Sequence, residues 1–341
     1  MKLIRSDGSE DGWSSCVLGA ERPLVRLRRA DVRTRARWLA TAATLTLAAM
    51  ATASSAQPMQ GTHEPRTYDE GLIPRFSFEV IEIDARGSLG VAVLDTTSGK
   101  ASAWRGDDRV PLNSTVKFLL CAAVLMRVDR GEEDLARPVP VAAADVVAHS
   151  PVLESHVGGT LTVGELCHAT MTRSDNGAAN LLMATLGGPE GLTALLREAG
   201  DTVTRIDRWE PELNDGPPGD PRDTTTPLAM LENLRRFLLG PTLTEGSRAT
   251  LRGWMEANAT GDERVRAGVP DGWAVGDRTG TGPDGTTSTI AILRPPGREP
   301  VLLAIYVASA GLSAAEAAPI HAELARIVTR DVLLDAEGFF D

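Results

Sequence analysis

Cysteine and aromatic residues are scarce in this sequence. Three cysteines among 341 residues are too few for a disulfide scaffold, and aromatic residues make up 4% of the chain. Basic residues are outnumbered, with 35 Lys+Arg against 46 Asp+Glu, and a net charge of −11 argues against a nucleic-acid-binding surface. The composition excludes a collagen, a coiled coil and a wholly disordered chain. The length fits one large domain or two interleaved ones.

The N-terminal segment has the layout of a secretory signal peptide. An apolar stretch of 13 residues, Trp38–Met50, is followed by small residues at Ser54-Ser55-Ala56. A basic run precedes it, formed by Arg22, Arg26, Arg28, Arg29, Arg33, Arg35 and Arg37. The apolar stretch is too short for a membrane span, and the alternative is a short buried helix. We therefore expect residues 1–56 to be a leader, cleaved near Ala56 on the way to the periplasm.

Removing the leader changes the composition. Residues 57–341 hold 26 Lys+Arg and 41 Asp+Glu, a net charge of −15. Only Cys121 and Cys167 remain, and two cysteines in an oxidising compartment readily form a disulfide. Only two lysines remain beside 24 arginines, Lys100 and Lys117, which makes each worth examining.

The hydrophobic pattern predicts strands at both ends of the chain and helices between them. Turn-forming residues separate the strand candidates, and residues 114–257 read as mainly helical. The expected outer elements are a helix over Tyr68–Arg86, strands over Leu89–Asp95, Ala101–Arg105, Trp273–Gly280, Thr286–Leu293 and Val301–Ser309, and a closing helix over Leu312–Leu334.

Ser114 and Lys117 form the first chemical motif. They stand one helical turn apart at the start of an apolar run that predicts a buried helix. A serine hydroxyl needs an adjacent base to act as a nucleophile, and burial drives a lysine toward its neutral, basic form. The alternative is an N-capping serine followed by a snorkelling lysine, because Ser-x-x-Lys is a common string.

Two further triplets accompany this motif. Ser174-Asp175-Asn176 lies in the helical region, and Arg278-Thr279-Gly280 lies on a strand candidate. Each could be a simple helix cap or strand end. In this order, however, the three motifs are typical of serine β-lactamases and penicillin-binding proteins.

A fourth segment separates these two groups. Arg208–Asn214 (RWEPELN) and Asp220–Pro227 (DPRDTTTP) resemble the Ω loop of class A serine β-lactamases nearly residue for residue. The resemblance spans roughly residues 66–337. It also includes Cys121, Leu166-Cys167, Ala178–Leu182 and Trp273.

The resemblance implies an α/β (α+β) fold of the serine β-lactamase and DD-peptidase type. Residues 57–112 and 258–341 would form one domain, an antiparallel five-stranded sheet flanked by helices. Residues 113–257 would form an all-helical domain that carries the Ω loop, 208–223. The active site would lie in the cleft between the two.

The same resemblance assigns catalytic roles. Ser114 would open the β-lactam ring to an acyl-enzyme, and Glu210 would activate the water that hydrolyses it, helped by Asn214. Whether Lys117 or Glu210 takes the proton during acylation is disputed for this family. Ser174 would relay a proton to the leaving nitrogen.

Other residues would contact the substrate. Asn176 would bind its side-chain amide, and the backbone N–H groups of Ser114 and Thr281 would form the oxyanion hole. Arg278 and Arg264 would face the substrate carboxylate with Thr279 as the neutral partner, and Gly280 would also contact the substrate. An Arg208–Asp223 pair would tie the two ends of the loop.

Three positions depart from the commonest family pattern. Arg278 replaces the usual lysine, a change associated with the carbenicillin-hydrolysing branch, although an arginine-rich chain could carry it through codon bias. Thr287 stands where many relatives hold an arginine for the substrate carboxylate, and Arg264 stands where other relatives supply it. His149 takes a position often held by tyrosine at the mouth of the site; it either flanks the substrate or is a surface histidine.

Other classes of protein fit less well. The histidines after the leader are scattered without ligand spacing, so we expect no metal and no cofactor. A penicillin-binding DD-peptidase would lack the 208–214 string, and a non-hydrolytic β-lactam sensor would lack the deacylating glutamate and carry a membrane tether. The sequence predicts a secreted monomer that hydrolyses small β-lactams, without stable membrane association.

Overall fold

The computed structural model describes residues 71–216, 219–283, 285–309 and 311–336. All of them belong to one compact unit, His63–Asp341. The predicted leader, residues 1–56, lies outside the described residues. Among the described helices, none combines the length and the apolar character that crossing a membrane requires.

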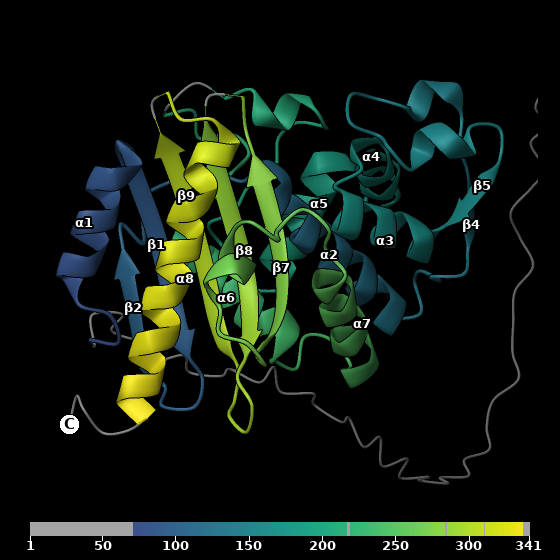
Figure 1. The fold of residues 1–341 in the computed structure, drawn as a ribbon. Helices are drawn as coiled ribbons and strands as arrows, with labels where there is room; N and C mark the ends of the chain where they lie inside the picture. The colour runs from purple at the N-terminus through teal and green to yellow at the C-terminus, as the bar shows by residue number, and fades with distance from the viewer. Residues whose placement is uncertain (1–70, 217–218, 284, 310, 337–341) are drawn as a thin grey trace, which may run out of the picture. The chain divides into compact units, whose positions relative to one another are not determined.

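A five-stranded antiparallel sheet forms the centre of this unit, in the order β2-β1-β9-β8-β7 (Figure 1). The first and last thirds of the chain both contribute to it, because β1 pairs with β9 along its whole length, from Gly87↔Ser309 to Asp95↔Val301. The strands are β1 (Gly87–Asp95), β2 (Ala101–Trp104), β7 (Ala274–Thr281), β8 (Thr286–Arg294) and β9 (Val301–Ser309).

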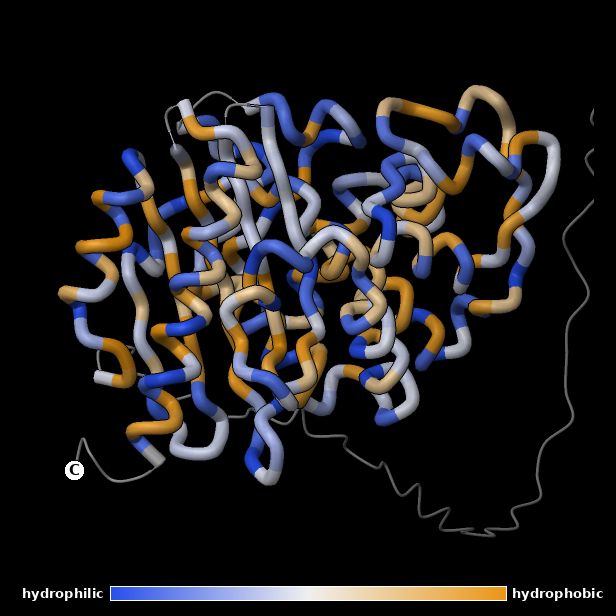
Figure 2. Tube along the Cα trace, in the orientation of Figure 1, coloured by the Kyte–Doolittle hydropathy of each residue, from blue (hydrophilic) through white to orange (hydrophobic). Residues whose placement is uncertain are grey.

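Two helices from opposite ends of the described chain cover one face of the sheet, α1 (Arg75–Ala85) and α8 (Ala314–Ala336). Hydrophobic and hydrophilic residues alternate along α8 in Figure 2, as expected for a helix with one buried side. The buried side chains of both helices pack on alternate strand residues, including Val91, Leu303 and Ile305. The period of two along each strand explains why these residues share a face.

The other face of the sheet packs on helices from the middle of the chain. Helix α2 (Val116–Asp129) is hydrophobic all round, and its residues 116–126 are all buried, as the sequence predicts for a central helix. The helices around it are α3 (Val163–Arg173), α4 (Asn176–Thr185), α5 (Gly188–Glu198), α6 (Pro227–Leu238) and α7 (Glu245–Glu256).

Short elements position the segments that carry the motifs. Strand β3 (Val110–Pro111) pairs with β6 (Thr224–Thr225), so the end of the 208–223 loop lies beside the segment that leads to Ser114. Strands β4 (Pro138–Pro140) and β5 (Thr160–Thr162) pair ahead of α3. Two short 3₁₀ helices, η1 (Asn113–Thr115) and η4 (Glu212–Asn214), complete the site segments.

The predicted elements agree closely with those observed. The first helix starts at Arg75 within the predicted range 68–86, and each of the predicted strands is present with ends shifted by at most two residues. The mixed α/β fold with a five-stranded antiparallel sheet is confirmed. The division into a sheet domain and an all-helical domain stays a prediction.

Candidate active site

Ser114 lies in η1, directly ahead of the buried helix α2, and its side chain is half-buried. Two groups contact its hydroxyl oxygen: Lys117 Nζ at 3.0 Å and the Ser174 hydroxyl, which donates to it at 3.0 Å. The preceding residue, Asn113, has a φ of 46°, an uncommon conformation for a non-glycine residue. The Asn113 side chain donates to Thr286 Oγ1 at 3.2 Å. The nucleophile candidate is therefore held at a constrained turn with a potential base in direct contact.

Lys117 is the centre of the polar cluster. Its ammonium group lies 3.0 Å from Glu210 Oε1, and it donates to Asn176 Oδ1 at 2.5 Å. It also donates to the Ser174 carbonyl at 2.9 Å and to the Ser174 hydroxyl at 3.1 Å. The side chains of Lys117 and Glu210 are both wholly buried. Burial lowers the pKa of Lys117 to about 8, against the opposing effect of the Glu210 carboxylate.

The triplet Ser174-Asp175-Asn176 forms the junction between α3 and α4. Ser174 ends α3 in the left-handed conformation (φ 59°), and Asp175 caps α4 by accepting from Ala178 N. The buried Asp175 carboxylate also accepts from two backbone N–H groups, those of Val152 and Leu153. This junction points both Ser174 and Asn176 at Lys117. The Asn176 amide is engaged at both ends, since its nitrogen donates to the Ala148 carbonyl at 2.8 Å.

Glu210 lies in the loop that follows Arg205, which pairs with Thr224, and its peptide bond to Pro211 is cis. The side chain of Asn180 fixes its backbone, donating to the Glu210 carbonyl at 2.8 Å and accepting from the Glu210 N–H at 3.0 Å. Asn214 Nδ2 donates to Glu210 Oε2 at 2.7 Å. The predicted partners Glu210 and Asn214 therefore lie together, with one carboxylate oxygen on Lys117 and the other on Asn214.

The two ends of this loop are joined by Arg208 and Asp223, whose Nε and Oδ2 atoms lie 2.6 Å apart. Asp223 is 1% exposed and also accepts from the N–H groups of Asp207 and Arg208. The contact differs from an exposed ion pair because the carboxylate is removed from water.

Strand β7 lies beside Ser114 and presents the third motif. Arg278 is fully buried, and its guanidinium donates to the Ser174 hydroxyl at 2.5 Å and to the Thr279 carbonyl at 2.8 Å. Burial lowers its pKa to about 10. A Cβ atom added at Gly280 would lie 3.1 Å from the Ser114 backbone nitrogen, so a glycine there allows the strand to approach the nucleophile. Thr281 ends the strand and is exposed.

Arg264 reaches β7 from the adjacent segment. Its guanidinium donates to the carbonyls of Gly280 and Ser288 at 2.8 and 2.9 Å, and to Thr281 Oγ1 at 2.8 Å. The side chain thus spans both paired strands at their ends next to Ser114. Thr287, the position where many relatives hold an arginine, bonds instead to the buried His321 at 2.9 Å. Burial holds the pKa of His321 well below its usual range, so this histidine is neutral.

His149 is the outermost of the predicted site residues. Its ring is exposed, with Nε2 3.2 Å from the Arg173 carbonyl, and its backbone has a φ of 62°. Its own carbonyl accepts from the Asn176 N–H at 2.9 Å. The structure therefore places His149 next to the cluster through its backbone, and within the described ranges its side chain makes no hydrogen bond to another predicted site residue.

The two cysteines lie next to each other on α2 and α3. Both are buried free thiols, and Cys121 Sγ donates to the Cys167 carbonyl at 3.8 Å. Burial raises the pKa of Cys167 well above its usual range. The predicted disulfide is not formed in this structure, and its formation after export stays a prediction.

Two positioning residues of the site were not predicted from the sequence. Asn180, the polar residue inside the apolar string Ala178–Leu182, fixes Glu210 as described above. Thr260 Oγ1 lies 2.5 Å from Thr279 Oγ1 and donates to Asn258 Oδ1 at 2.8 Å. Asn180 could have been suspected, because a polar side chain in a buried helix usually has a specific hydrogen-bond partner. Thr260 carries no such signal.

The arrangement suits acyl transfer. It supplies a serine hydroxyl, a buried lysine with a lowered pKa, a second hydroxyl between them, and a carboxylate on a rigid loop. Groups of three or more His, Cys, Asp or Glu side chains arranged to hold a metal ion are absent from the part of the chain that the structure describes.

Comparisons with known proteins identify relatives of this fold and site. Residues 78–332 match the family described as "Beta-lactamase enzyme family". An ancestral (GNCA) class A β-lactamase is 53% identical, with a TM-score of 0.74, over 75% of this chain and 98% of that one. A β-lactamase from Xanthomonas campestris pv. campestris is 47% identical, with a TM-score of 0.74, over 76% of this chain and 97% of that one.

Proposed function

This chain belongs to the β-lactamase enzyme family and resembles its class A members, and from this premise we propose that it hydrolyses β-lactams through an acyl-enzyme on Ser114. One observation carries the proposal: Lys117 Nζ lies within 3.1 Å of the Ser114 hydroxyl, the Ser174 hydroxyl and the Glu210 carboxylate. A base, a relay and a hydrolytic carboxylate thereby meet at one nucleophile.

In acylation, the Ser114 oxygen forms a bond to the β-lactam carbonyl carbon, and the ring C–N bond breaks. Lys117 in its neutral form takes the serine proton, because it is the basic group in direct contact with that hydroxyl. The Ser174 hydroxyl, which contacts both groups, passes a proton to the leaving nitrogen. The backbone N–H groups of Ser114 and Thr281 bind the carbonyl oxygen as negative charge develops on it.

In deacylation, Glu210 takes a proton from a water molecule that attacks the ester carbon, and Asn214 helps to hold that water. The bond between this carbon and the Ser114 oxygen then breaks, and the proton passes to the serine oxygen. Support comes from the fixed position of the carboxylate, which Asn180 secures through the backbone and Asn214 through the side chain. A base held by packed neighbours needs little reorganisation during the reaction.

The test is the Glu210→Ala variant with benzylpenicillin. We expect acylation without turnover, so that a mass increase equal to one intact penicillin accumulates on Ser114. Glu212→Ala is the matched control, because Glu212 lies in the same loop but is exposed. Turnover by Glu210→Ala at a rate near that of the native enzyme would refute the assignment.

We also propose that carboxypenicillins are substrates. Arg278 supplies a planar cation where most relatives have a lysine, and among the described residues its Nε atom has no hydrogen-bond partner. Arginine can bind a carboxylate through two parallel hydrogen bonds, which a lysine cannot. The expected kcat/KM for carbenicillin is within about tenfold of that for benzylpenicillin, a gap of about 1.4 kcal/mol. A hundredfold gap, or an unchanged ratio in Arg278→Lys, would reject the proposal.

Export to the periplasm is proposed from the N-terminal sequence, with cleavage near Ala56. The N-terminal sequence of the protein recovered from the periplasm tests it. A chain that retains Trp38–Met50, or that stays in the cytoplasm, would contradict it.

A further inference from the structure

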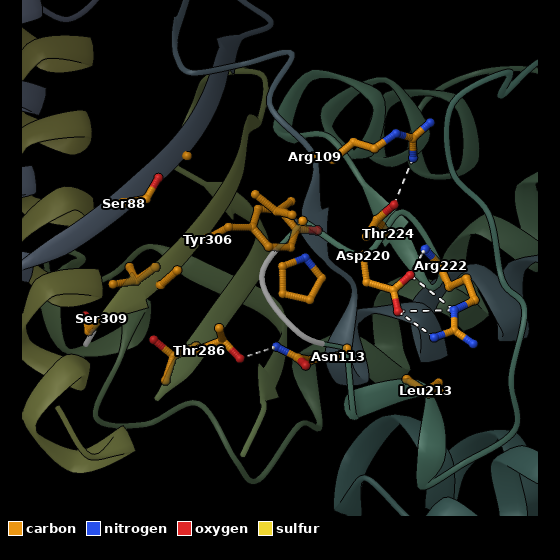
Figure 3. Close-up of a pocket in the computed structure, with 18 of the residues that line it drawn as sticks. Ser88, Arg109, Asn113, Leu213, Asp220, Arg222, Thr224, Thr286, Tyr306 and Ser309 are labelled. Atoms are coloured by element: carbon orange, nitrogen blue, oxygen red, sulfur yellow. Dashed lines mark hydrogen bonds and ion pairs between the residues drawn. The ribbon is translucent and has the colours of Figure 1, made fainter. Parts of the chain in front are cut away.

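A cavity of about 680 Å³ lies outside the catalytic cluster (Figure 3). None of the predicted catalytic or substrate-binding residues lines it. Its walls come from the ends of β1, β8 and β9, from β3 and β6, and from the loop after Glu210. Its volume is within the range of small-molecule binding sites.

One side of the cavity is apolar. Val110 and Pro111 line it together with the ring of Tyr306, which lies near the centre of Figure 3, while Leu213 lies on the side of Asp220 and Arg222. The Tyr306 hydroxyl pairs with Thr115 Oγ1 at 3.3 Å, so the ring does not require a polar partner from the cavity. This wall suits a flat hydrocarbon group.

The floor beside this wall is built from small side chains. Ala308 pairs in register with Ser88 on one side and with Thr286 on the other, so these three residues share one face of the sheet. All three line the cavity. Because Ala308 is exposed at the end of its strand, a larger side chain there would occupy the cavity without entering the core.

The opposite side carries positive charge. Arg208 forms an ion pair with Asp223, and Arg222 forms one with Asp220. Arg109 instead donates hydrogen bonds to two neutral oxygens within the described ranges, Thr224 Oγ1 at 2.8 Å and the Val203 carbonyl at 3.2 Å. The three guanidinium groups that line the cavity are therefore paired with two carboxylates, of which only Asp220 also lines it. The excess charge favours an anionic ligand.

Two buried polar atoms at the cavity have no hydrogen-bond partner among the described residues: Arg208 Nη2 and Asn113 Oδ1. Buried polar atoms in folded proteins nearly always have a partner. The first is a donor suited to an anion. The second belongs to the residue that precedes Ser114, so the cavity adjoins the catalytic segment without sharing its reactive groups.

We propose that this cavity is a second ligand site, which binds a small aromatic anion. The ring packs on Tyr306 and Pro111, and the carboxylate or sulfonate faces Arg109 and the free nitrogen of Arg208. The apolar wall, the arginine without a carboxylate partner among the described residues, and the unpartnered donor together support this site. It does not depend on the proposed catalytic mechanism.

The test measures binding of 1-naphthoate by isothermal titration calorimetry, with neutral 1-naphthamide as the charge control. We expect the amide to bind at least about tenfold more weakly than the anion, and Arg109→Gln to weaken naphthoate about tenfold. Ala308→Phe should abolish binding by filling the cavity. Arg105→Gln is the matched control, because Arg105 is an exposed arginine of the same segment that pairs with Glu82 and does not line the cavity.

A second arm separates this site from the catalytic one. Naphthoate should bind with unchanged affinity in the presence of saturating benzylpenicillin, measured with Glu210→Ala so that the antibiotic is not consumed. Displacement by benzylpenicillin, equal binding of the amide, or full binding to Ala308→Phe would overturn the proposal. Hydrolysis of benzylpenicillin by Ala308→Phe and Arg109→Gln shows that these variants are folded. If Ser114 is not acylated at all, that result counts against the catalytic proposal and leaves the second ligand site unaffected.

Discussion

The lowered pKa of Lys117 gives a quantitative prediction for acylation. With a pKa of about 8, roughly one tenth of the lysine is neutral at pH 7, against about three parts in ten thousand for a lysine with a pKa of 10.5. The lowered pKa therefore raises the amount of available base about 300-fold at pH 7. If Lys117 takes the proton of Ser114, the acylation rate constant should rise about tenfold per pH unit below pH 8 and level off above it.

The perturbation that isolates this effect is Lys117→Arg. Arginine keeps the positive charge next to Glu210 but does not lose its proton in this pH range, so acylation should slow by about 10²–10⁴-fold. Truncation to alanine would be less informative, since it leaves the buried Glu210 carboxylate without its cation at a cost of about 3–5 kcal/mol.

The assay is single-turnover mixing with benzylpenicillin, quenched and read as the mass of the Ser114 adduct, from pH 6 to pH 9. An internal check follows from the sign of the Glu210 contribution. Because that carboxylate raises the pKa of Lys117, the rising limb should move to lower pH in Glu210→Gln. A rate constant independent of pH between 6 and 8, or Lys117→Arg acylating within tenfold of the native enzyme, would refute Lys117 as the base.

Three other predictions concern stability, the cysteines and substrate binding. Arg208→Ala should lower the free energy of unfolding in urea by about 2–4 kcal/mol, because it leaves the buried Asp223 carboxylate without its cation. The control Arg205→Ala removes the more exposed Arg205–Asp207 pair and should lower it by under about 1 kcal/mol. Equal losses in the two variants would contradict this prediction. Protein from the periplasm should contain a Cys121–Cys167 disulfide that contributes up to about 4 kcal/mol, and two alkylatable thiols after denaturation would disprove it. Arg264→Ala should lower kcat/KM by about tenfold or more for penicillins and cephalosporins alike, since all carry the ring carboxylate, with Arg264→Lys retaining more activity; unchanged kinetics would remove Arg264 from the carboxylate pocket.

The sequence predicted most of the fold because the strands carry clear signals. β9 and the second half of β8 are apolar runs, turns that contain Pro and Gly separate β7, β8 and β9 in the sequence, and α2 is apolar on all sides. The motifs then located Ser114, Lys117 and Glu210, which the structure brings together. The spacing of Ser114 and Lys117 predicted their contact, whereas Glu210 comes from a segment far along the chain, and only the resemblance to a family indicated that it meets them.

Other features of the site depend on tertiary contacts that no local pattern encodes. The left-handed backbone of Ser174, which turns its side chain toward Lys117, is not typical of serine. The contacts of Arg264 with two strand carbonyls require the register of β7 and β8. The hydrogen bonds from the Asn176 side-chain nitrogen and backbone N–H likewise depend on the path of residues 148–149, whose carbonyls accept them.

The pairing of β1 with β9 has a consequence for folding. The two strands are separated by more than 200 residues, so their contacts have a high contact order, and closing a loop of that length delays the completion of the sheet. Strand β1 lacks its main partner until residues 301–309 are available, and β8 lacks one of its two neighbours. A chain truncated before Val301 should therefore remain sensitive to protease along its whole length, with Ser114 unreactive toward penicillin, even though almost every site residue is already present.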